Sequence, residues 1–254
     1  MFPAERRMII MTTLEQRGSV SVAELAEQLR TSAVTIRKDL EALAHSGLVE
    51  RSHGGAILSG DRPFTLSYDF RGIQSLAEKE AIGKAAALLV NSKETVLIDC
   101  GTTTIHLAKN LSQVEILRCI TNDLQIAQTL AVWPQITVSL TAGIVRGPTM
   151  PLWGIECQRS ILSLHEVDKT FLSISGIHLE RGLTNTYSVE VEAKRAMIQV
   201  AREVILLADS SKFGKAAPAF VADLSAVRKV VTGRDAPADM VTRLSEMGIE
   251  VILA

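Results

Sequence analysis

From residue 78 to the C-terminus, short apolar runs alternate with stretches of helical periodicity, and this alternation constrains the fold more than any other feature of the chain. Strands that alternate with helices of this length imply a mostly parallel sheet covered by helices on both faces. The strands are expected at 95–99, 116–121, 136–141, 169–175, 204–208, 229–232 and 250–253, and the helices at 78–90, 102–110, 123–131, 154–163, 190–202 and 237–247. The sequence therefore predicts an α/β domain in which ligands bind outside the carboxyl ends of the strands.

The first 58 residues follow a different pattern, in which three short helical stretches succeed one another with no strand-like alternation between them. Apolar side chains at helical spacing predict helices over Arg6–Arg17, from Ser21 and from about Ser32. Gly54 and Gly55 then form a turn between two short strand-like segments, 48–53 and 56–58, which predicts a small hairpin. This order of helices and hairpin is that of a winged helix-turn-helix domain, whose third helix enters the major groove of DNA.

Residues 59–77 separate the two patterns. They lose all periodicity and open with Gly60, Asp61, Arg62 and Pro63, residue types that are common in turns and linkers. We therefore expect a winged helix-turn-helix DNA-binding domain over 1–58, a linker over 59–77 and an α/β ligand-binding domain over 78–254.

Positive and negative charges balance, since 27 Lys and Arg stand against 28 Asp and Glu, and the first 58 residues carry seven of each. This balance excludes tight indiscriminate adhesion to nucleic acid, so that any DNA binding must rest on a local surface. No apolar run reaches the ~18–20 residues that span a bilayer, and the cysteines stand far apart without a Cys-x-x-Cys pair. We expect a cytoplasmic protein with no membrane segment, no disulfide, no metal site and no cofactor.

The third predicted helix carries the candidate DNA contacts. Its apolar stripe is Ile36, Leu40 and Leu43, and the 100° step of a helix turns other side chains away from that stripe. The polar side chains that suit contacts with DNA are Ser32, Thr35, Arg37 and Lys38 on or beside this outer face, with Arg51 and His53 on the hairpin. The alternative is that these are ordinary solvated charges. The order of three helices and a wing favours DNA binding.

A second candidate site follows the first strand of the C-terminal domain. Asp99 ends this strand, and the turn Cys100-Gly101-Thr102-Thr103-Thr104 leads into a helix. A glycine lets the backbone approach a ligand. We expect the three threonine hydroxyls and the N–H groups of the helix N-terminus to face outward, an arrangement that favours an anion such as phosphate. The alternative is that the threonines only cap the helix.

Other strand ends and one helix supply further polar groups. Lys212 follows a strand and two serines and is suited to hold a phosphate, while Asp99 or Glu192 can accept hydrogen bonds from sugar hydroxyls. Lys194 can serve either purpose. The alternative for Glu190, Glu192 and Lys194 is a solvated helix face, with an i,i+4 ion pair between Glu190 and Lys194.

Over nearly its whole length the chain resembles the DeoR family of bacterial transcriptional regulators. In the N-terminal domain the resemblance rests on Ala4-Glu5-Arg6-Arg7, Gly18 to Ala26, Val34 to Leu40 and Arg51 to Ala56. In the C-terminal domain it rests on Asp99 to Thr104, Thr121-Asn122, Ser175 to Ile177, Gly182 to Thr184, Glu192 to Met197 and Asp209 to Gly214.

The resemblance implies a role for particular residues in each domain. The residues that it places on DNA are Ser32, Thr35, Arg37, Lys38, Arg51 and His53. Asp39 is interpreted as structural, holding the helix or the wing through a salt bridge or hydrogen bond. The C-terminal domain is similar to the sugar-phosphate isomerase and CoA-transferase fold, and the resemblance implies that it binds a phosphorylated sugar. The implied ligand shell is Asp99, Gly101, Thr102, Thr103, Thr104, Asn122, Lys194 and Lys212.

The leading hypothesis is a repressor of a sugar or sugar-derivative catabolic operon, released from double-stranded operator DNA by a phosphorylated sugar. A homodimer or homotetramer is expected, because one recognition helix reads only a few base pairs. The sequence does not distinguish an activator from a repressor, since the effect on transcription depends on where the operator lies relative to the promoter.

The rival hypothesis is a sugar-phosphate isomerase that carries a DNA-binding domain. The isomerase-like fold places paired carboxylates after the strand that Thr170–Ser175 occupies here, whereas this chain continues with Gly176-Ile177-His178-Leu179. We therefore expect binding without turnover.

Cys100 carries a separate pair of alternatives. A thiol at a helix N-terminus can have a lowered pKa and act as a redox sensor. The other interpretation is that Cys100 is a small packing residue.

Overall fold

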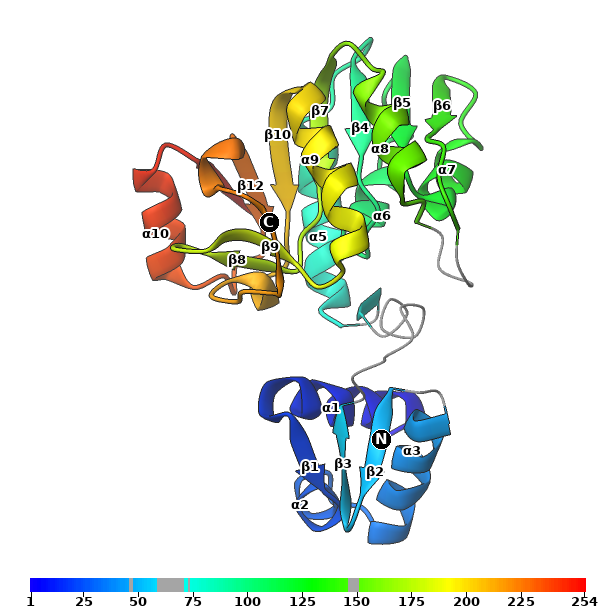
Figure 1. Ribbon diagram of the computed structural model, residues 1–254, viewed down its shortest axis with the longest axis vertical. Coiled ribbons are helices and arrows are strands. Elements are labelled where there is room, and N and C mark those ends of the chain that lie inside the picture. The colour runs from blue at the N-terminus through cyan, green and yellow to red at the C-terminus, as the bar shows by residue number, and fades with distance from the viewer. Residues whose placement is uncertain (46–47, 59–70, 73, 146–150) are drawn as a thin grey trace. The chain divides into compact units, whose positions relative to one another are not determined.

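A computed structural model describes residues 1–45, 48–58, 71–72, 74–145 and 151–254, apart from the side chains at positions 4, 5, 8, 15 and 16. The chain divides into two compact units, residues 1–74 and residues 75–254, each with its own core (Figure 1). Most of the expected linker lies outside the described residues. Within the described ranges, no helix is both long enough and apolar enough to cross a membrane.

The N-terminal unit is a winged helix-turn-helix. Its elements are α1 (Pro3–Arg17), β1 (Ser19–Ser21), α2 (Val22–Gln28), α3 (Ala33–His45), β2 (Val49–Ser52) and β3 (Gly55–Leu58), and its three strands form an antiparallel sheet in the order β1, β3, β2. The three predicted helices and the hairpin are confirmed. The absence of a strand before the hairpin was a wrong prediction, because β1 pairs with β3. In this three-residue strand only Val20 is buried, which is too little alternation to indicate a strand.

Helix ends and apolar spacing explain the three helices of this unit. The Ser21 hydroxyl accepts a hydrogen bond from the Glu24 N–H group at 3.1 Å and so begins α2. In α3, the predicted stripe of Ile36, Leu40 and Leu43 is buried against the core of the unit. The exposed outer face of α3 includes the polar side chains of Arg37 and Lys38.

The C-terminal unit is built on a seven-stranded parallel sheet, which confirms the predicted α/β class. Along the sheet the strands run in the order β13, β12, β10, β7, β4, β5, β6. Their bounds are β4 (Thr95–Ile98), β5 (Leu117–Thr121), β6 (Ile136–Leu140), β7 (Val167–Leu172), β10 (Ala201–Leu207), β12 (Lys229–Thr232) and β13 (Glu250–Leu253). The helices are α5 (Leu76–Ala87), α6 (Thr104–Ala108), α7 (Leu124–Leu130), α8 (Ile155–Leu162), α9 (Val191–Val200) and α10 (Ala238–Glu246).

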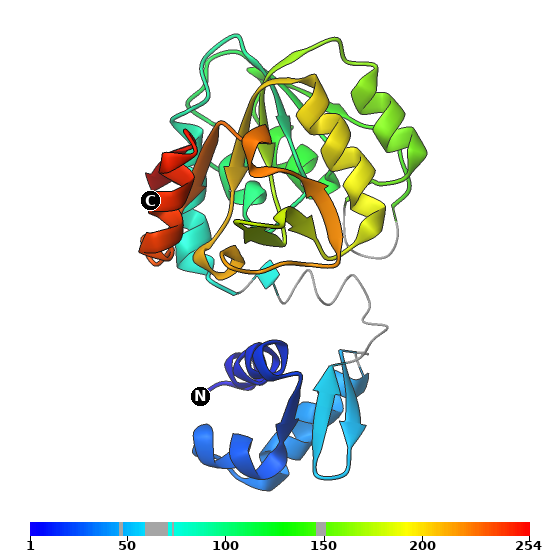
Figure 2. The same cartoon turned by 60° about the vertical axis from the view of Figure 1, so that its left-hand side comes forward.

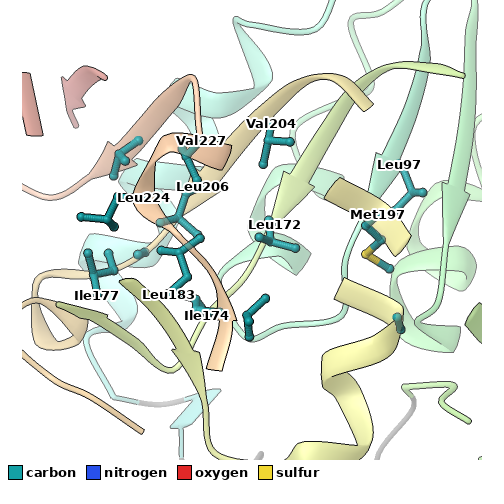
Figure 3. Packing of buried hydrophobic residues seen from close by; sticks show 14 of the residues in the cluster. Leu97, Leu172, Ile174, Ile177, Leu183, Met197, Val204, Leu206, Leu224 and Val227 are labelled. Atoms are coloured by element: carbon teal, nitrogen blue, oxygen red, sulfur yellow. The ribbon is translucent and has the colours of Figure 1, made fainter. Parts of the chain in front are cut away.

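Alternate side chains of the inner strands enter two different cores, one on each face of this sheet. In β4, Val96 and Ile98 pack with α5, α6 and α7, while Leu97 packs on the face covered by α8, α9 and α10. Figure 3 shows the second of these cores, where Leu97 and Leu172 of the sheet meet Met197 of α9. Burial on both faces explains why the strands are nearly continuous apolar runs.

A small antiparallel sheet also covers the second of these faces, and its strands were not predicted. It contains β8 (Gly176–His178), β9 (Gly182–Asn185) and β11 (Ala219–Ala222) in the order β11, β9, β8 (Figure 2). Ile177 and Leu183 point from it into the core. The strand expected over 169–175 ends at Leu172, and the chain leaves the parallel sheet to form this smaller one. Strands of three or four residues carry too little periodicity to be found in the sequence.

The strand order creates a switch point. β4 is the first parallel strand in the chain but lies inside the sheet, with β5 on one side and β7 on the other. Connections therefore leave β4 and β7 in opposite directions, and in open α/β sheets ligands bind at such a point, outside the carboxyl ends of the strands. Asp99 follows β4 and Ser173 follows β7, so both residues lie at this point.

Candidate functional sites

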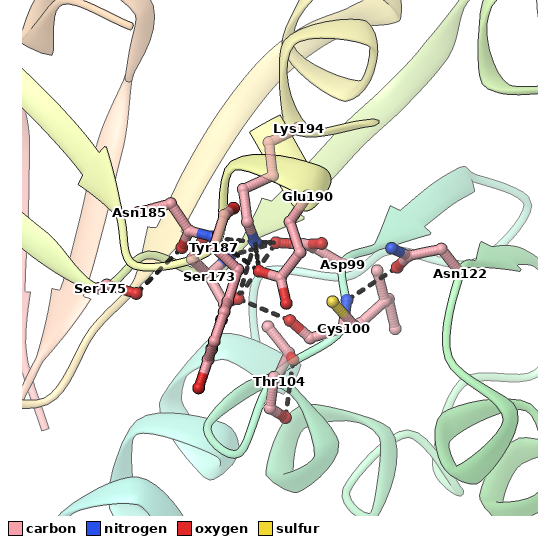
Figure 4. A network of polar contacts seen from close by, with 12 residues as sticks. Asp99, Cys100, Thr104, Asn122, Ser173, Ser175, Asn185, Tyr187, Glu190 and Lys194 are labelled. Atoms are coloured by element: carbon pink, nitrogen blue, oxygen red, sulfur yellow. Dashed lines mark hydrogen bonds and ion pairs between the residues drawn. The ribbon is translucent and has the colours of Figure 1, made fainter. Parts of the chain in front are cut away.

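A buried ion pair occupies the switch point. Lys194 reaches down from α9, and its Nζ lies 2.5 Å from Asp99 Oδ2 and 3.8 Å from Glu190 Oε2 (Figure 4). The side chains of Lys194 and Asp99 are 1% and 0% exposed. The interpretation of Glu190 and Lys194 as a solvated helix face was therefore wrong, although their i,i+4 pairing is confirmed. Glu192 does lie on a solvated face, where it pairs with Arg195.

Ser173 fixes the geometry of this pair. Its N–H group donates to Asp99 Oδ2 at 3.0 Å, and its carbonyl and hydroxyl oxygens accept from Lys194 Nζ at 3.1 and 3.3 Å. Its hydroxyl donates to the Cys100 carbonyl at 2.6 Å. Lys194 is thus surrounded by acceptors of the protein itself, while Asp99 Oδ1 has no hydrogen-bond partner among the described residues.

The ammonium of Lys194 stays protonated. Burial alone would lower the pKa of Lys194, but the charges of Asp99 and Glu190 outweigh burial, so that the pKa lies above its usual value. A protonated, fully paired lysine holds carboxylates in place and does not act as a base or a nucleophile. Its role at the switch point is structural and electrostatic.

A second layer of amides and hydroxyls supports Glu190. Asn185 Nδ2, at the end of β9, donates to Glu190 Oε2 at 2.7 Å, and Asn185 Oδ1 accepts from the Ser175 hydroxyl at 3.0 Å. The position of Ser175 at the end of a predicted strand indicated a polar group at the sheet edge, whereas nothing in the sequence indicated Asn185, because β9 was not predicted. Ser173 was missed because the strand was expected to continue past it.

The threonine turn after Asp99 is folded inward, contrary to the prediction of outward hydroxyls. Thr103 and Thr104 are buried, and the Thr104 hydroxyl donates to the Gly101 carbonyl at 3.0 Å. Thr102 alone of the three is partly exposed. A Cβ atom at Gly101 would lie 2.8 Å from the Ser173 Oγ atom, so the glycine is needed for close packing against β7. Thr102 remains the open hydroxyl of the turn, whereas the Ile105 and His106 N–H groups at the start of α6 already donate to the Gly101 and Thr103 carbonyls.

Asn122 and Cys100 form the other wall of the turn. Asn122 Oδ1 accepts from the Cys100 N–H group at 2.8 Å, and its Nδ2 donates to the Leu152 carbonyl at 3.3 Å. Burial and the neighbouring charges of Asp99 and Glu190 raise the pKa of the Cys100 thiol well above its usual value. A reactive thiolate is therefore not formed at neutral pH, which favours the interpretation of Cys100 as a packing residue.

Lys212 lies in a separate part of the same sheet edge. It ends the 3₁₀ turn Ser210–Lys212 after β10, and its Nζ is 3.8 Å from Asp209 Oδ2. Glu78 of α5 anchors this turn by accepting from the Ser210 N–H group at 2.6 Å. The structure thus joins Asp99 with Lys194 and places Gly101 and Thr104 beside them, whereas Lys212 contacts a different carboxylate.

His178 has a local structural role. Its Nδ1 atom accepts from the backbone N–H groups of Glu180 and Arg181, at 3.2 and 3.3 Å, and so shapes the turn between β8 and β9. Among the described residues, no three His, Cys, Asp or Glu side chains gather into a group that could hold a metal ion.

In the N-terminal unit, α3 presents the predicted outer face. Arg37 and Lys38 are exposed, and so are Arg51 and His53 on the wing. The Ser32 hydroxyl accepts from the Thr35 N–H group at 3.1 Å and forms a second hydrogen bond with the Thr35 hydroxyl at 2.9 Å. Ser32 is therefore the cap of α3, with its side chain still open to solvent.

Two contacts hold α3 in position. Arg51 Nη1 donates to the Arg37 carbonyl at 3.4 Å, which ties the wing to the helix. Asp39 is buried and pairs with Arg6 of α1 and, at 3.5 Å, with Arg7 Nε. The structural interpretation of Asp39 is confirmed: it fastens α3 to α1 rather than facing outward.

Comparison with known proteins places both units in one family. A model described as a DeoR-like helix-turn-helix domain matches residues 6–61, and a model described as the DeoR C-terminal sensor domain matches residues 74–234. The chain is 34% identical over 254 residues to the HTH-type transcriptional regulator GolR of Listeria innocua, covering 100% of both chains. It is 34% identical over 249 residues to the glycerol-3-phosphate regulon repressor of Escherichia coli K12, covering 98% of each.

A solved structure also aligns with part of the chain. Ribose 5-phosphate isomerase A from Methanocaldococcus jannaschii matches with a TM-score of 0.38 and 14% identity, over 53% of each chain.

Proposed function

Since the chain belongs to the DeoR family of transcriptional regulators, we propose that it represses a sugar-catabolic operon and leaves its operator when a phosphorylated sugar binds the C-terminal unit. The family membership confirms the resemblance that the motifs indicated. Both full-length relatives are named as a transcriptional regulator or repressor, and the chain is accordingly a DNA-binding regulator and not an enzyme.

The observation that carries the sensing part is the unpartnered oxygen of Asp99. This residue is fully buried at the switch point, and its Oδ1 atom has no hydrogen-bond donor among the described residues. A buried carboxylate oxygen without a donor is costly, and a hydroxyl group of a bound ligand would remove that cost. Sugars carry such hydroxyls, so Asp99 supports a sugar ligand held by its hydroxyl end.

The phosphate of the ligand belongs on the opposite side of the turn. The two carboxylates of Asp99 and Glu190 outnumber the single ammonium of Lys194, so the net charge of this cluster is negative and disfavours an anion beside it. Thr102, the partly exposed threonine of the turn, offers a hydroxyl donor that carries no charge of its own. We assign the sugar hydroxyls to Asp99 and the phosphate to the Thr102 end.

Release of DNA requires that the ligand favours one of two states of the protein. A sugar that binds more tightly to the DNA-free state lowers the affinity for the operator, and the operator lowers the affinity for the sugar by the same factor. A homodimer or homotetramer acting in the cytoplasm would place two or more recognition helices on repeated half-sites. Sedimentation of the purified chain distinguishes these two assemblies from a monomer, and a monomer bound to a single half-site would contradict this part of the proposal.

DNA binding is tested with fragments from upstream of the chain's own gene at several salt concentrations. We expect Lys38→Ala to reduce the slope of the logarithm of the binding constant against the logarithm of the salt concentration by about 1 for each half-site bound, because one phosphate contact is lost in each half-site. Arg17→Ala is the matched control, since Arg17 is an exposed cation at the end of α1 outside the proposed interface. Failure of the unaltered protein to bind any upstream fragment, or equal effects of the two variants, would contradict the proposal.

Sensing is tested by a thermal-shift screen of sugar phosphates, followed by operator binding with each stabilising compound. We expect Thr102→Val to weaken the response to the effector about fivefold, the value of one hydrogen bond, while leaving operator binding unchanged. Thr129→Val removes a hydroxyl of similar exposure in α7 and is the control. If every sugar phosphate leaves operator binding unaltered, the sensing part is wrong and the DNA-binding part still stands.

A further inference from the structure

An apolar side chain stands on the outer face of the recognition helix. Val34 is the second residue of α3, and 58% of it is exposed to solvent. It takes no part in the buried core of the N-terminal unit, which on this helix is formed by Ile36, Leu40 and Leu43. Valine is also a poor choice for an exposed helical position, because its branched Cβ lowers helix propensity. Neither packing nor propensity accounts for this residue.

The surroundings of Val34 carry positive charge. Arg37 and Lys38 lie three and four residues further along α3, so they are its neighbours on the helix surface, and both are exposed. Arg51 of the wing reaches the same helix through its contact with the Arg37 carbonyl. Val34 together with these cations is complementary to a partner surface that has an apolar group with negative charges around it.

The first turn of α3 is the part that comes nearest to base edges when a recognition helix lies in the major groove. In this turn the hydroxyls of Ser32 and Thr35 are hydrogen-bonded to each other, and the Ser32 hydroxyl also accepts from the Thr35 N–H group. Val34 lies between them and has no atom that can donate or accept a hydrogen bond. The apolar feature that the major groove offers to such a side chain is the C5-methyl group of thymine.

We propose that Val34 is a specificity-determining residue that packs against the methyl group of one thymine in each operator half-site. This inference rests on the proposed DNA binding and goes beyond it by naming the base that one residue reads. Burial of one methyl group favours the thymine about fourfold over the same base without its methyl.

The experiment uses the full chain and a library of random double-stranded DNA. Selection with the unaltered protein defines the operator, and each thymine of that operator is then replaced in turn by uracil, which lacks only the methyl group. We expect the unaltered protein to lose affinity about fourfold at one thymine per half-site. For Val34→Ala we expect weaker binding to the original operator and no further loss when that same thymine becomes uracil.

Two controls separate this effect from general damage. Ile57→Ala truncates another large apolar residue, 41% exposed on β3 of the same unit, and should retain the full sensitivity to the thymine methyl. Lys38→Ala should weaken binding to the thymine and uracil operators equally. If Val34→Ala keeps the sensitivity of the unaltered protein at every thymine, or if Val34→Ala changes the oligomeric state instead, the inference is overturned. If the unaltered protein enriches no sequence, the proposed DNA binding itself has failed.

Discussion

Lys194 Nζ lies 2.5 Å from Asp99 Oδ2, and this buried ion pair joins two residues that are 95 positions apart in the chain. It links the end of β4 to α9 at the switch point, where the chain connections after β4 and β7 leave in opposite directions (Figure 4). Because Ser173 bonds to both partners, the pair also fixes the end of β7. The proposed sensor pocket is therefore held together by charges that the ligand does not need to supply.

Removal of either charge should destabilise the C-terminal unit strongly. We expect Lys194→Met to lower its free energy of unfolding by about 3–5 kcal/mol, because Asp99 and Glu190 would be left buried without a counter-charge. The double variant Lys194→Met with Asp99→Asn should lose less than the sum of the two single losses. Urea unfolding followed by circular dichroism measures these values.

The control for this prediction is an exposed ion pair of the same unit. Arg202 pairs with Glu166, with side chains 63% and 52% exposed, and Arg202→Ala should cost far less than Lys194→Met, because solvent screens an exposed pair. A loss for Lys194→Met as small as that for Arg202→Ala would contradict the structural role of the buried pair.

Asp39 should matter for the stability of the N-terminal unit although it does not face the proposed DNA surface. It is 5% exposed and pairs with Arg6, so Asp39→Ala leaves a largely buried guanidinium without its acceptor. We expect a loss of about 1–3 kcal/mol in the unfolding free energy of this unit. Glu41→Ala alters an exposed carboxylate two residues further along α3 and should change stability by no more than about 0.5 kcal/mol. Equal effects of the two variants would mean that the pair with Arg6 does not hold α1 and α3 together.

The two glycines of the wing should respond differently to alanine. A Cβ atom at Gly55 would lie 2.0 Å from the Val20 carbonyl oxygen, so Gly55→Ala must push β1 and β3 apart and should abolish operator binding. Gly54 has open space around its Cα but a φ of +86°, so Gly54→Ala should cost only about 1–2 kcal/mol of backbone strain and preserve binding. Circular dichroism and operator binding at low temperature distinguish the two outcomes, and a harmless Gly55→Ala would show that the contact with β1 is dispensable.

Apolar spacing in the sequence predicted most of the helices and strands, and it predicted the whole buried face of α3. The stripe of Ile36, Leu40 and Leu43 is buried as its spacing indicated, and the seven parallel strands lie within a few residues of their expected bounds. Apolar spacing is informative for these elements because each is long enough for buried positions to recur over two or more periods of the helix or strand. Short strands such as β8, without such repetition, were missed.

The composition of the sensor pocket could not be predicted in the same way. Helical spacing placed Glu190 and Lys194 on one face but carried no information about what covers that face, and the cover is the end of β4 with Asp99. Strand order decides this contact, since β4 and β7 become neighbours only through a crossover in the sheet. The contact between Asn185 and Glu190 could not be predicted either, because Asn185 lies on β9, a strand that the apolar spacing did not indicate.

Because of His106, the free energy of unfolding of the C-terminal unit should decrease as the pH falls. This residue of α6 is 6% exposed, and burial, with a smaller effect from Lys109, lowers its pKa below the ordinary value of 6.5. The unfolded chain therefore binds a proton more readily than the folded protein, and the stabilisation present above about pH 6.5 is lost as the pH falls toward the folded-state pKa.

Urea unfolding at pH 7.5 and at several lower values down to pH 5 should show this loss in the unaltered protein and a shallower one in His106→Gln. The control, His165→Gln, removes an exposed imidazole of the same unit and should keep the original pH dependence. If His106→Gln shows the same slope as the unaltered protein over this range, protonation of His106 is not what destabilises the folded unit in weak acid.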